Sequence, residues 1–350
     1  MTPARTVAGG NGRAATLSDV AREAGVSLAT ASRAINGSTN RSVRADLRDR
    51  VLDAAARLHY SPNANAQAMA RGKTATLGLI VHDISDPFFS TIAAGVTEAA
   101  DAAGLAVTLA NTHHDADREL GFIQTLQNLR ARSIIVVGGR QDDAIANERL
   151  REALAGYRER GGTAAMVGQP ILGVNAVHVD NRGAAADLAR ALHGLGYRRF
   201  AVLGGPAQHL TAAERREGFL DALAELGSPV PDEAVVPSEF VRDGGHAGMK
   251  ELLRRDVEVE AVFAVNDVMA LGAMTAAREA GIDLPTELAF AGFDDIAALR
   301  DVTPTLTTVR IDMVDIGRRV TTLALAESEG PELVTVSGEV VLRESTPGRR

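Results

Sequence analysis

The sequence predicts an α/β protein with a small three-helix head followed by two doubly wound α/β lobes. Three observations lead to this expectation. Residues 16–60 show three short helical patterns, and beyond residue 75 apolar runs alternate with helical patterns. The charge also divides the chain. Of its 37 Lys and Arg and 45 Asp and Glu, residues 1–73 hold 11 and 5, leaving 26 and 40 for the remainder. A basic segment on an acidic body suggests a nucleic-acid-binding head, although a solvated basic surface is the plain alternative.

Length and composition narrow the class of protein. A chain of 350 residues with 45% hydrophobic residues suits two or three domains. It contains no cysteine, which excludes disulfides and thiolate metal sites, and no run of 18 apolar residues, so no membrane segment or membrane partner is expected. The polar, glycine-rich residues 1–15 lack the apolar stretch of a secretory signal. We therefore expect a disordered tail there and a cytoplasmic location.

The head begins with two helices separated by a glycine. Thr16 and Asp19 have the spacing of a capped helix start, and Gly25 supplies a stop because glycine takes the left-handed conformation at little cost. Ser27 is a second N-cap. In the helix that it opens, Ala31 and Ile35 can pack inward. The opposite face then carries small and polar side chains, namely Leu28, Ala29, Ser32, Arg33 and Asn36.

Two short helices joined by a tight glycine turn predict a helix-turn-helix, although a helical hairpin with an ordinary wet face shows the same pattern. A recognition helix needs a small or polar outer face because that face enters the major groove. Arg33 can donate two hydrogen bonds to a guanine edge, and Asn36 is a further donor to a base or phosphate.

A third helical pattern and a short linker complete the segment. In "VRADLRDRVLDAAARLHY" the apolar stripe is Leu47, Val51, Ala55 and Leu58. The helix must stop before Pro62, and the following "NANAQAMA" is a helix-capable stretch too short and too poor in large apolar residues to be stable alone.

Residues 16–73 closely resemble the head and hinge of the lactose repressor (LacI/GalR) family. The matching pieces are "LSDVAREAGVS", "ATASRAING", "RDRVLDAAARLHYSPN" and "AQAMARG". One departure is "GSTNRSVRADL", where the connection between helices two and three is about two residues longer than in the lactose repressor. The resemblance implies a DNA-binding head at 16–60 and a hinge helix at 61–74, with Met69 as an apolar wedge for the minor groove. The implied DNA-contacting residues are Thr16, Ser27, Leu28, Ala29, Thr30, Ser32, Arg33, Asn36, Asn63 and Met69.

The body shows two series of strand-like runs. The first is "TLGLIVH", "LAVTLAN", "SIIVVGG" and "TAAMVG"; the second is "AVHVD", "FAVLGG", "VFAVN" and "LAFAGFD". Continuous apolar strands alternating with helices indicate parallel sheets covered on both faces. We expect one lobe from residues 75–172 with 305–330, and another from 175–300 with 331–345. This resembles the periplasmic sugar-binding-protein fold that the family uses as its sensor and dimerisation domain, here residues 75–350.

Ligands of open α/β sheets bind beyond the carboxyl ends of the strands, here between the lobes. After the first strand, Asp83 and Asp86 can accept hydrogen bonds from hydroxyls. Phe88 or Phe89 can offer a ring face, and we expect the other to be core. The resemblance adds four ligand-binding positions: Arg215, Phe240, Asn266 and Asp294. Carboxylates, an amide and an arginine around an aromatic slot suit a polyhydroxylated ligand such as a sugar.

Other polar residues near the strand ends are given different roles. Gly138 and Gly168 stand where the lactose repressor has polar groups, so we do not expect this chain to bind a lactose-like ligand. We expect Arg140, with Gln169, to reach into the pocket instead. Arg216 is expected in solvent. Asp267 and Asp295 are expected to cap helices or serve the structure.

An enzyme and a transport-type binding protein are the rival classes. His113, His114 and Asp115 are only a weak metal signal, and a solvated surface fits them better. The chain has no nucleophile elbow, Walker loop or GxGxxG motif, so we expect no catalytic residue, cofactor or metal. The lack of a secretory signal and the basic head argue against a transport-type binding protein.

We therefore predict a transcription regulator, a repressor that binds a pseudo-palindromic operator as a homodimer under control of a sugar-like effector. The C-terminal residues contain no heptads, so a tetramer is not expected.

Overall fold

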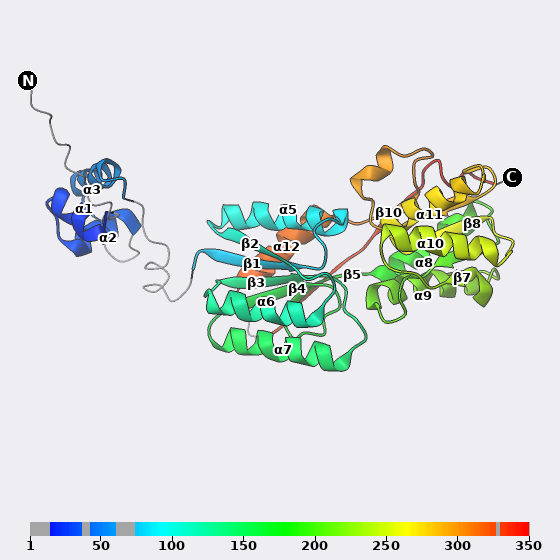
Figure 1. The fold of residues 1–350 in the computed structure, drawn as a ribbon, viewed down its shortest axis with the longest axis horizontal. Helices are drawn as coiled ribbons and strands as arrows, with labels where there is room; N and C mark the ends of the chain where they lie inside the picture. The colour runs from blue at the N-terminus through cyan, green and yellow to red at the C-terminus, as the bar shows by residue number, and fades with distance from the viewer. Residues whose placement is uncertain (1–14, 37–42, 61–73, 327–329, 350) are drawn as a thin grey trace, which may run out of the picture. The chain divides into compact units, whose positions relative to one another are not determined.

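The computed structural model describes residues 15–36, 43–60, 74–326 and 330–349. The chain divides into two compact units, Met1–Thr74 and Ala75–Arg350, which are considered separately below. Figure 1 follows the chain through both units. Within the described ranges, none of the helices is long and apolar enough to cross a membrane.

The first unit contains three short helices, α1 (Leu17–Glu23), α2 (Leu28–Asn36) and α3 (Ala45–Arg57). The predicted capping box is present, since Thr16 Oγ1 accepts from the Asp19 amide and an Asp19 carboxylate oxygen accepts from the Thr16 amide. Gly25 has a φ of 64°, the left-handed turn that was predicted between the first two helices. A small apolar core holds the helices together: Val20, Ala21, Ala24, Ala31, Ala34, Val51 and Ala54.

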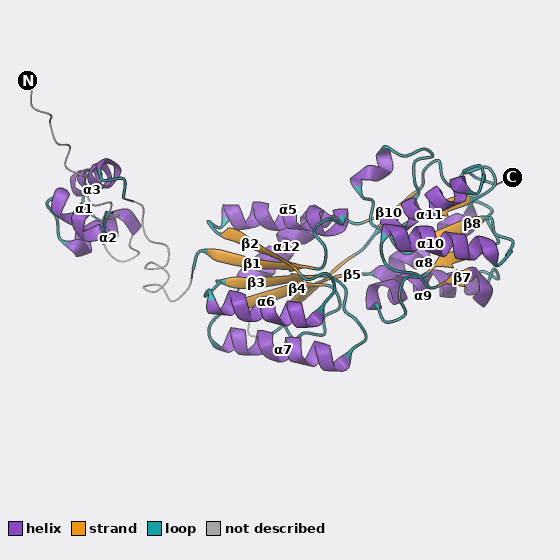
Figure 2. Cartoon of the chain, in the orientation of Figure 1, coloured by secondary structure: helices purple, strands orange, loops and turns teal. Residues whose placement is uncertain are grey.

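The first lobe of the second unit is built on a six-stranded parallel sheet (Figure 2). Its strand order is β11-β5-β4-β3-β1-β2. Helices α5 (Pro87–Ala102) and α12 (Met313–Leu325) pack together on one face, and α6 (Ala116–Asn128) and α7 (Ala144–Glu159) cover the other. The strands are β1 (Thr76–Val81), β2 (Ala106–Asn111), β3 (Ser133–Val137), β4 (Thr163–Val167), β5 (Asn175–Val179) and β11 (Leu333–Val336).

The second lobe repeats this plan around a four-stranded parallel sheet in the order β7-β6-β8-β9. Two helix pairs cover it, α8 with α9 and α10 with α11. The strands are β6 (Phe200–Leu203), β7 (Val235–Val236), β8 (Ala261–Ala264) and β9 (Ala289–Ala291). The helices are α8 (Asn181–Gly194), α9 (Leu210–Glu225), α10 (Arg242–Arg254) and α11 (Asp267–Glu279).

Two strands lie in a different lobe from the one expected. We predicted residues 175–300 with 331–345 for the second lobe, but β5 pairs with β4 and β11 pairs with β5, so residues 175–179 and 333–336 lie in the first sheet. The buried Asn175 explains this: its side-chain amide donates to Leu323 O at 2.8 Å and its oxygen accepts from the Glu332 amide at 2.9 Å. Both strands therefore belong to the first lobe. We also expected residues 305–330 there, but β10 (Thr308–Arg310) pairs with β12 (Glu339–Val341), and bridges from Thr307 to Ala291 and from Arg310 to Asp294 join it to the second lobe.

Candidate functional site

Helix α2 presents the small, polar face that a DNA-reading helix requires. Ser27 caps it, because its hydroxyl accepts from the Thr30 amide at 3.1 Å. Leu28 is 52% exposed, and Ala29 and Arg33 are also exposed. Ala31 lies in the core as predicted, whereas Ile35 is only partly buried against it.

The remaining predicted DNA contacts are less exposed or lie elsewhere. Thr16, Thr30, Ser32 and Asn36 are half-buried, and the Asn36 side-chain amide donates to Ser32 Oγ at 3.2 Å. Asn63 and Met69, the predicted hinge contacts, lie outside the described residues.

A cavity of about 390 Å³ lies between the two lobes, at the carboxyl ends of their strands. Eight of the nine predicted effector residues line it: Asp83, Asp86, Phe88, Phe89, Arg215, Phe240, Asn266 and Asp294. Its volume is within the range of small-molecule sites.

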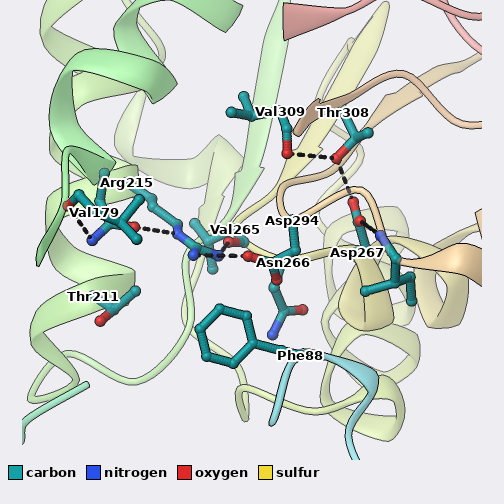
Figure 3. Close-up of polar contacts among 12 residues, drawn as sticks. Phe88, Val179, Thr211, Arg215, Val265, Asn266, Asp267, Asp294, Thr308 and Val309 are labelled. Carbon is teal, nitrogen blue, oxygen red and sulfur yellow. Dashed lines mark hydrogen bonds and ion pairs between the residues drawn. The ribbon is translucent and has the colours of Figure 1, made fainter. Parts of the chain in front are cut away.

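Arg215 forms the centre of the polar wall. It is only 2% exposed, and its guanidinium donates from Nε to Asn181 Oδ1 at 2.9 Å and from Nη1 to Val265 O at 2.8 Å. Nη2 donates to Asp294 Oδ1 at 2.9 Å. The guanidinium also stacks 3.8 Å above the centre of the buried Phe293 ring. These contacts fix its orientation at the cavity (Figure 3).

Asp294 is a buried carboxyl with a second oxygen beyond its bond to Arg215. Burial raises its pKa to about 8; Arg215 opposes this shift, and nearby Asp267 and Asp86 add to it. Its φ of 121° is unusual for a residue with a side chain, and such strain is found preferentially at functional positions.

Aromatic rings form the apolar walls. Phe88, at the start of α5, reaches toward Asn266 and the Arg215–Asp294 pair (Figure 3). Phe89 belongs to the hydrophobic core, as expected for one of the two, although it also borders the cavity. On the other side Phe240 stacks on His209 with ring centres 4.5 Å apart. Such flat surfaces suit the apolar face of a sugar ring.

The first lobe contributes two carboxylates. Asp83 Oδ1 accepts from both the amide and the hydroxyl of Ser85, and these bonds lower its pKa although its burial acts in the opposite direction. Asp86 caps α5 by accepting from the Phe88 amide at 2.9 Å, and burial raises its pKa. Each carboxylate therefore keeps one oxygen clear of these bonds.

Arg140 does not line the cavity, which corrects our expectation. It is buried, and its guanidinium donates to both carboxylate oxygens of Glu119, at 2.9 and 3.0 Å, and contacts His82 Nε2 at 2.9 Å. The two charge-assisted bonds to Glu119 hold the guanidinium away from the cavity. Gln169 likewise turns toward the second lobe and bonds Thr211 and Glu214.

Asn266 lines the cavity but is largely occupied by the protein. Its Oδ1 accepts from the Met269 amide at 2.8 Å, capping α11, and its Nδ2 donates to Phe240 O at 3.3 Å. One amide hydrogen remains for an effector.

Several residues that line the cavity were not predicted from the sequence, among them Ser85, His114, His209, Thr211, Arg242 and Asp243. His114 follows β2 and His209 follows β6, so their places at strand ends were a usable signal. His114 was expected on a solvated surface. Burial lowers the pKa of both histidines, that of His209 to about 3, so both are neutral near pH 7.

Three other predicted roles can be compared with the structure. Arg216 was expected in solvent, but it is half-buried and donates from Nη1 to Gly204 O at 3.3 Å. Asp267 accepts from Thr308 Oγ1 at 2.7 Å and from the Ile296 amide at 3.0 Å, and Asp295 pairs with Arg310 and Arg343, so both serve the structure as expected. Within the described ranges, no group of three His, Cys, Asp or Glu side chains is arranged to hold a metal ion.

Two family models match the chain. Residues 16–63 match "Bacterial regulatory proteins, lacI family", and residues 74–325 match "Periplasmic binding proteins and sugar binding domain of LacI family". The chain belongs to the LacI family. It is therefore a DNA-binding transcription regulator with a two-lobed sensor, in a family of regulators rather than of enzymes.

Relatives and solved structures agree over nearly the whole length of this LacI-family chain. It is 36% identical to the transcriptional regulator GalR of Escherichia coli, with 95% of this chain and 96% of the relative covered. It is 35% identical to GalS of Salmonella typhimurium, with 92% of each covered. A structure of the transcriptional regulator CelR in complex with cellobiose matches with a TM-score of 0.68 and 29% identity, covering 95% of this chain and 99% of that one.

Proposed function

We propose that this regulator represses transcription in the cytoplasm by binding a pseudo-palindromic operator as a homodimer, and that a sugar or sugar derivative bound between its lobes controls it. The observation that carries the effector proposal is the Arg215–Asp294 pair. The pair is buried, it joins α9 to the segment that follows β9, and it borders a cavity with aromatic walls.

The chemistry of the cavity favours a neutral, polyhydroxylated ligand. Asp83, Asp86 and Asp294 offer acceptors, whereas Arg215 and the free amide hydrogen of Asn266 offer donors. A ring hydroxyl is both donor and acceptor, so adjacent hydroxyls can satisfy a carboxylate and a guanidinium together. The structure of CelR with cellobiose is consistent with this ligand class.

For DNA we propose that α2 enters the major groove, with Arg33 reading a base, and that residues 61–74 form a hinge. In this proposal the head is residues 16–60 and Met69 inserts into the minor groove. The exposed Arg33 and the small side chains around it support the groove-reading role of α2.

A thermal-shift screen of sugars with the full-length chain tests the effector proposal. A sugar that binds the folded protein raises the unfolding temperature in a concentration-dependent way. The shift should vanish in Arg215→Ala and persist in the matched control Arg216→Ala, because Arg216 lies on the same helix but does not line the cavity. Where Arg215→Ala folds poorly, Arg215→Lys keeps a charge for Asp294 but cannot make all three bonds. A sugar that stabilises the Arg215 variants and the wild type equally would place the effector elsewhere.

A further inference from the structure

The two lobes meet along a short seam beside the cavity, formed by residues 139–142 of the first lobe and 208–211 of the second. The Leu210 amide donates to Arg140 O at 2.9 Å, and the Asp142 amide donates to Gln208 O at 2.8 Å. Gln141 and His209 face each other between these bonds as an antiparallel bridge. A Cβ at Gly139 would collide with Thr211 Oγ1, so the lobes are in direct contact there.

Gln169 ties this seam to helix α9. Its side chain is buried, and its Oε1 accepts from the Arg140 amide at 2.8 Å. Its Nε2 donates across the lobe boundary to Thr211 Oγ1 and to Glu214 Oε2, each at 3.1 Å. A single side chain of the first lobe therefore holds two residues of the second.

Glu214 passes this contact on to the effector arginine. The same Oε2 atom accepts from Asn181 Nδ2 at 2.8 Å, and Asn181 Oδ1 accepts from Arg215 Nε at 2.9 Å. An unbroken path of side-chain hydrogen bonds thus runs from Gln169 through Glu214 and Asn181 to Arg215, and from there to Asp294.

We propose that Gln169 and Glu214 are positioning residues that couple the arrangement of the lobes to the orientation of Arg215. When the lobes separate at the seam, Glu214 loses the donor from Gln169 and is free to move away from Asn181. The Arg215 Nε bond to Asn181 is then weakened, while the bonds of Arg215 to Val265 O and Asp294 remain, so the guanidinium is held less firmly in its orientation toward the cavity. By linkage, a sugar that needs Arg215 in this orientation favours the lobe arrangement in which the seam is made. The link to a sugar rests on the proposed function, but the link between the seam and Arg215 does not.

The absence of cysteine allows a direct test by spin labelling. Ile145 in the first lobe and Leu226 in the second are exposed, and replacing both with Cys gives two labelling sites in the full-length chain. Pulsed electron spin resonance then reports the distance between the lobes. Labelled chain is mixed with excess unlabelled chain so that distances between subunits do not contribute.

The informative variant is Gln169→Glu, which places a second carboxylate beside Glu214. At pH 7.5 the two negative charges repel each other, and we expect the ratio of long-distance to short-distance populations to rise about tenfold over the parent, as for the loss of a hydrogen bond to a charged group. At pH 5.5 the pair can share a proton, and the short distance should return. His209, His114 and Arg215 also face this region, so the parent is measured at both pH values. Gln169→Ala should open the lobes at both.

Two further variants separate coupling from mere disturbance. The double variant Gln169→Glu/Glu214→Gln exchanges the amide and the carboxylate, and it should restore the short distance at pH 7.5. Arg215 lies away from the seam, but Arg215→Ala should also raise the long-distance population because Asn181 Oδ1 loses the donor that it has in Arg215 Nε. Glu217→Gln is the control, since Glu217 is on α9 but pairs with the exposed Arg182.

The proposal is overturned if Gln169→Glu keeps the parental distances at pH 7.5, if the exchanged pair fails to restore them, or if Arg215→Ala leaves them unchanged. Because no effector enters this experiment, such a result leaves the sugar site standing. If the variants change the distances as expected but no sugar stabilises the chain in the thermal-shift screen, only the proposal that the effector is a sugar is contradicted.

Discussion

At the scale of the residue, the Arg215–Asp294 pair shows how burial and partnership decide chemistry. A buried charge is tolerated only with hydrogen-bonding partners, and Arg215 has three such partners together with the Phe293 ring. Asp294 has Arg215 on one oxygen, which leaves the other for a ligand hydroxyl. Burying the pair therefore costs stability, and the same pair offers a binding site for a ligand hydroxyl.

The raised pKa of Asp294 predicts a pH dependence of stability. Its pKa of about 8 lies above the ordinary 3.8, so the folded state holds the proton to higher pH than the unfolded state does. Stability from this group is therefore full below pH 4 and declines as pH rises toward 8, by up to about 1.4 kcal/mol per pH unit. Chemical unfolding of wild type and Asp294→Asn at pH 5, 6, 7 and 8 measures it. The difference between the two should change steadily with pH; parallel curves would mean that Arg215 keeps Asp294 ionised throughout.

Arg33 gives the corresponding prediction for DNA. If its guanidinium grips one base, Arg33→Ala should cost about 1–3 kcal/mol of discrimination at a single base position. Binding competitions between a selected operator and its single-base variants measure this cost. An equal loss of affinity for operator and random DNA would assign Arg33 to the phosphates.

Residue by residue, the sequence predicted side chains whose roles follow from strand ends. Asp83 and Asp86 border the cavity because they follow β1 and the carboxyl ends of parallel strands meet there. Arg215, on α9, and Asp294 were expected from the family resemblance, and both also border the cavity. Arg140 also follows a strand, yet it turns away to Glu119 on α6, 21 residues earlier. Nothing local to Arg140 reveals that partner, so its direction could not be predicted.

At the scale of the element, the helix pairs of the sensor cross at glycines. A Cβ at Gly317 of α12 would collide with Ile92 O of α5, and one at Gly95 would collide with Val314 O. These close approaches let α5 and α12 lie backbone to backbone over the first sheet. The helical periodicity of each segment was visible in the sequence, but which helices pair was not.

This packing predicts that Gly317→Ala destabilises the sensor by about 1–3 kcal/mol, because the helices must move apart. Gly121→Ala is the matched control, since a Cβ at this helical glycine meets nothing within 4 Å. There the change should be neutral or stabilising by up to about 1 kcal/mol. Urea unfolding measures the free energy of unfolding of both variants. Equal values for Gly317→Ala and Gly121→Ala would show that the close helix crossing does not require glycine.

The strands were easier to predict from the sequence than the lobe to which each of them belongs. Each of the four apolar runs in the first predicted series is a strand of the first sheet. The runs of β1, β3 and β4 read as continuous apolar segments because these strands are buried on both faces, whereas the edge strand β2 is mostly exposed. The prediction that β5 and β11 belong to the second lobe was wrong, because the lobe of a strand depends on long-range contacts such as those of Asn175.

At the scale of the whole molecule, an effector can act on DNA only through different contacts in two arrangements of the chain. Arg215→Ala removes those contacts while the head remains a separate compact unit. If the sugar is an inducer, the variant should bind operator as the wild type does and ignore the sugar. If it is a corepressor, the variant should bind operator poorly under all conditions. Operator titrations by fluorescence anisotropy distinguish the two, and a variant that responds with the wild-type midpoint would fit neither.

Operator affinity, measured as a function of sugar concentration, tests most directly whether a sugar bound at Arg215 controls DNA binding. The operator is first selected from random duplexes with the full-length chain, and the sugar is the strongest hit of the thermal screen. We predict that the operator dissociation constant of the wild type changes at least tenfold across the titration, that Arg216→Ala behaves alike, and that Arg215→Ala and Arg215→Lys show no change. A sugar that binds tightly while leaving operator affinity constant, or that still acts on both Arg215 variants, would contradict the account.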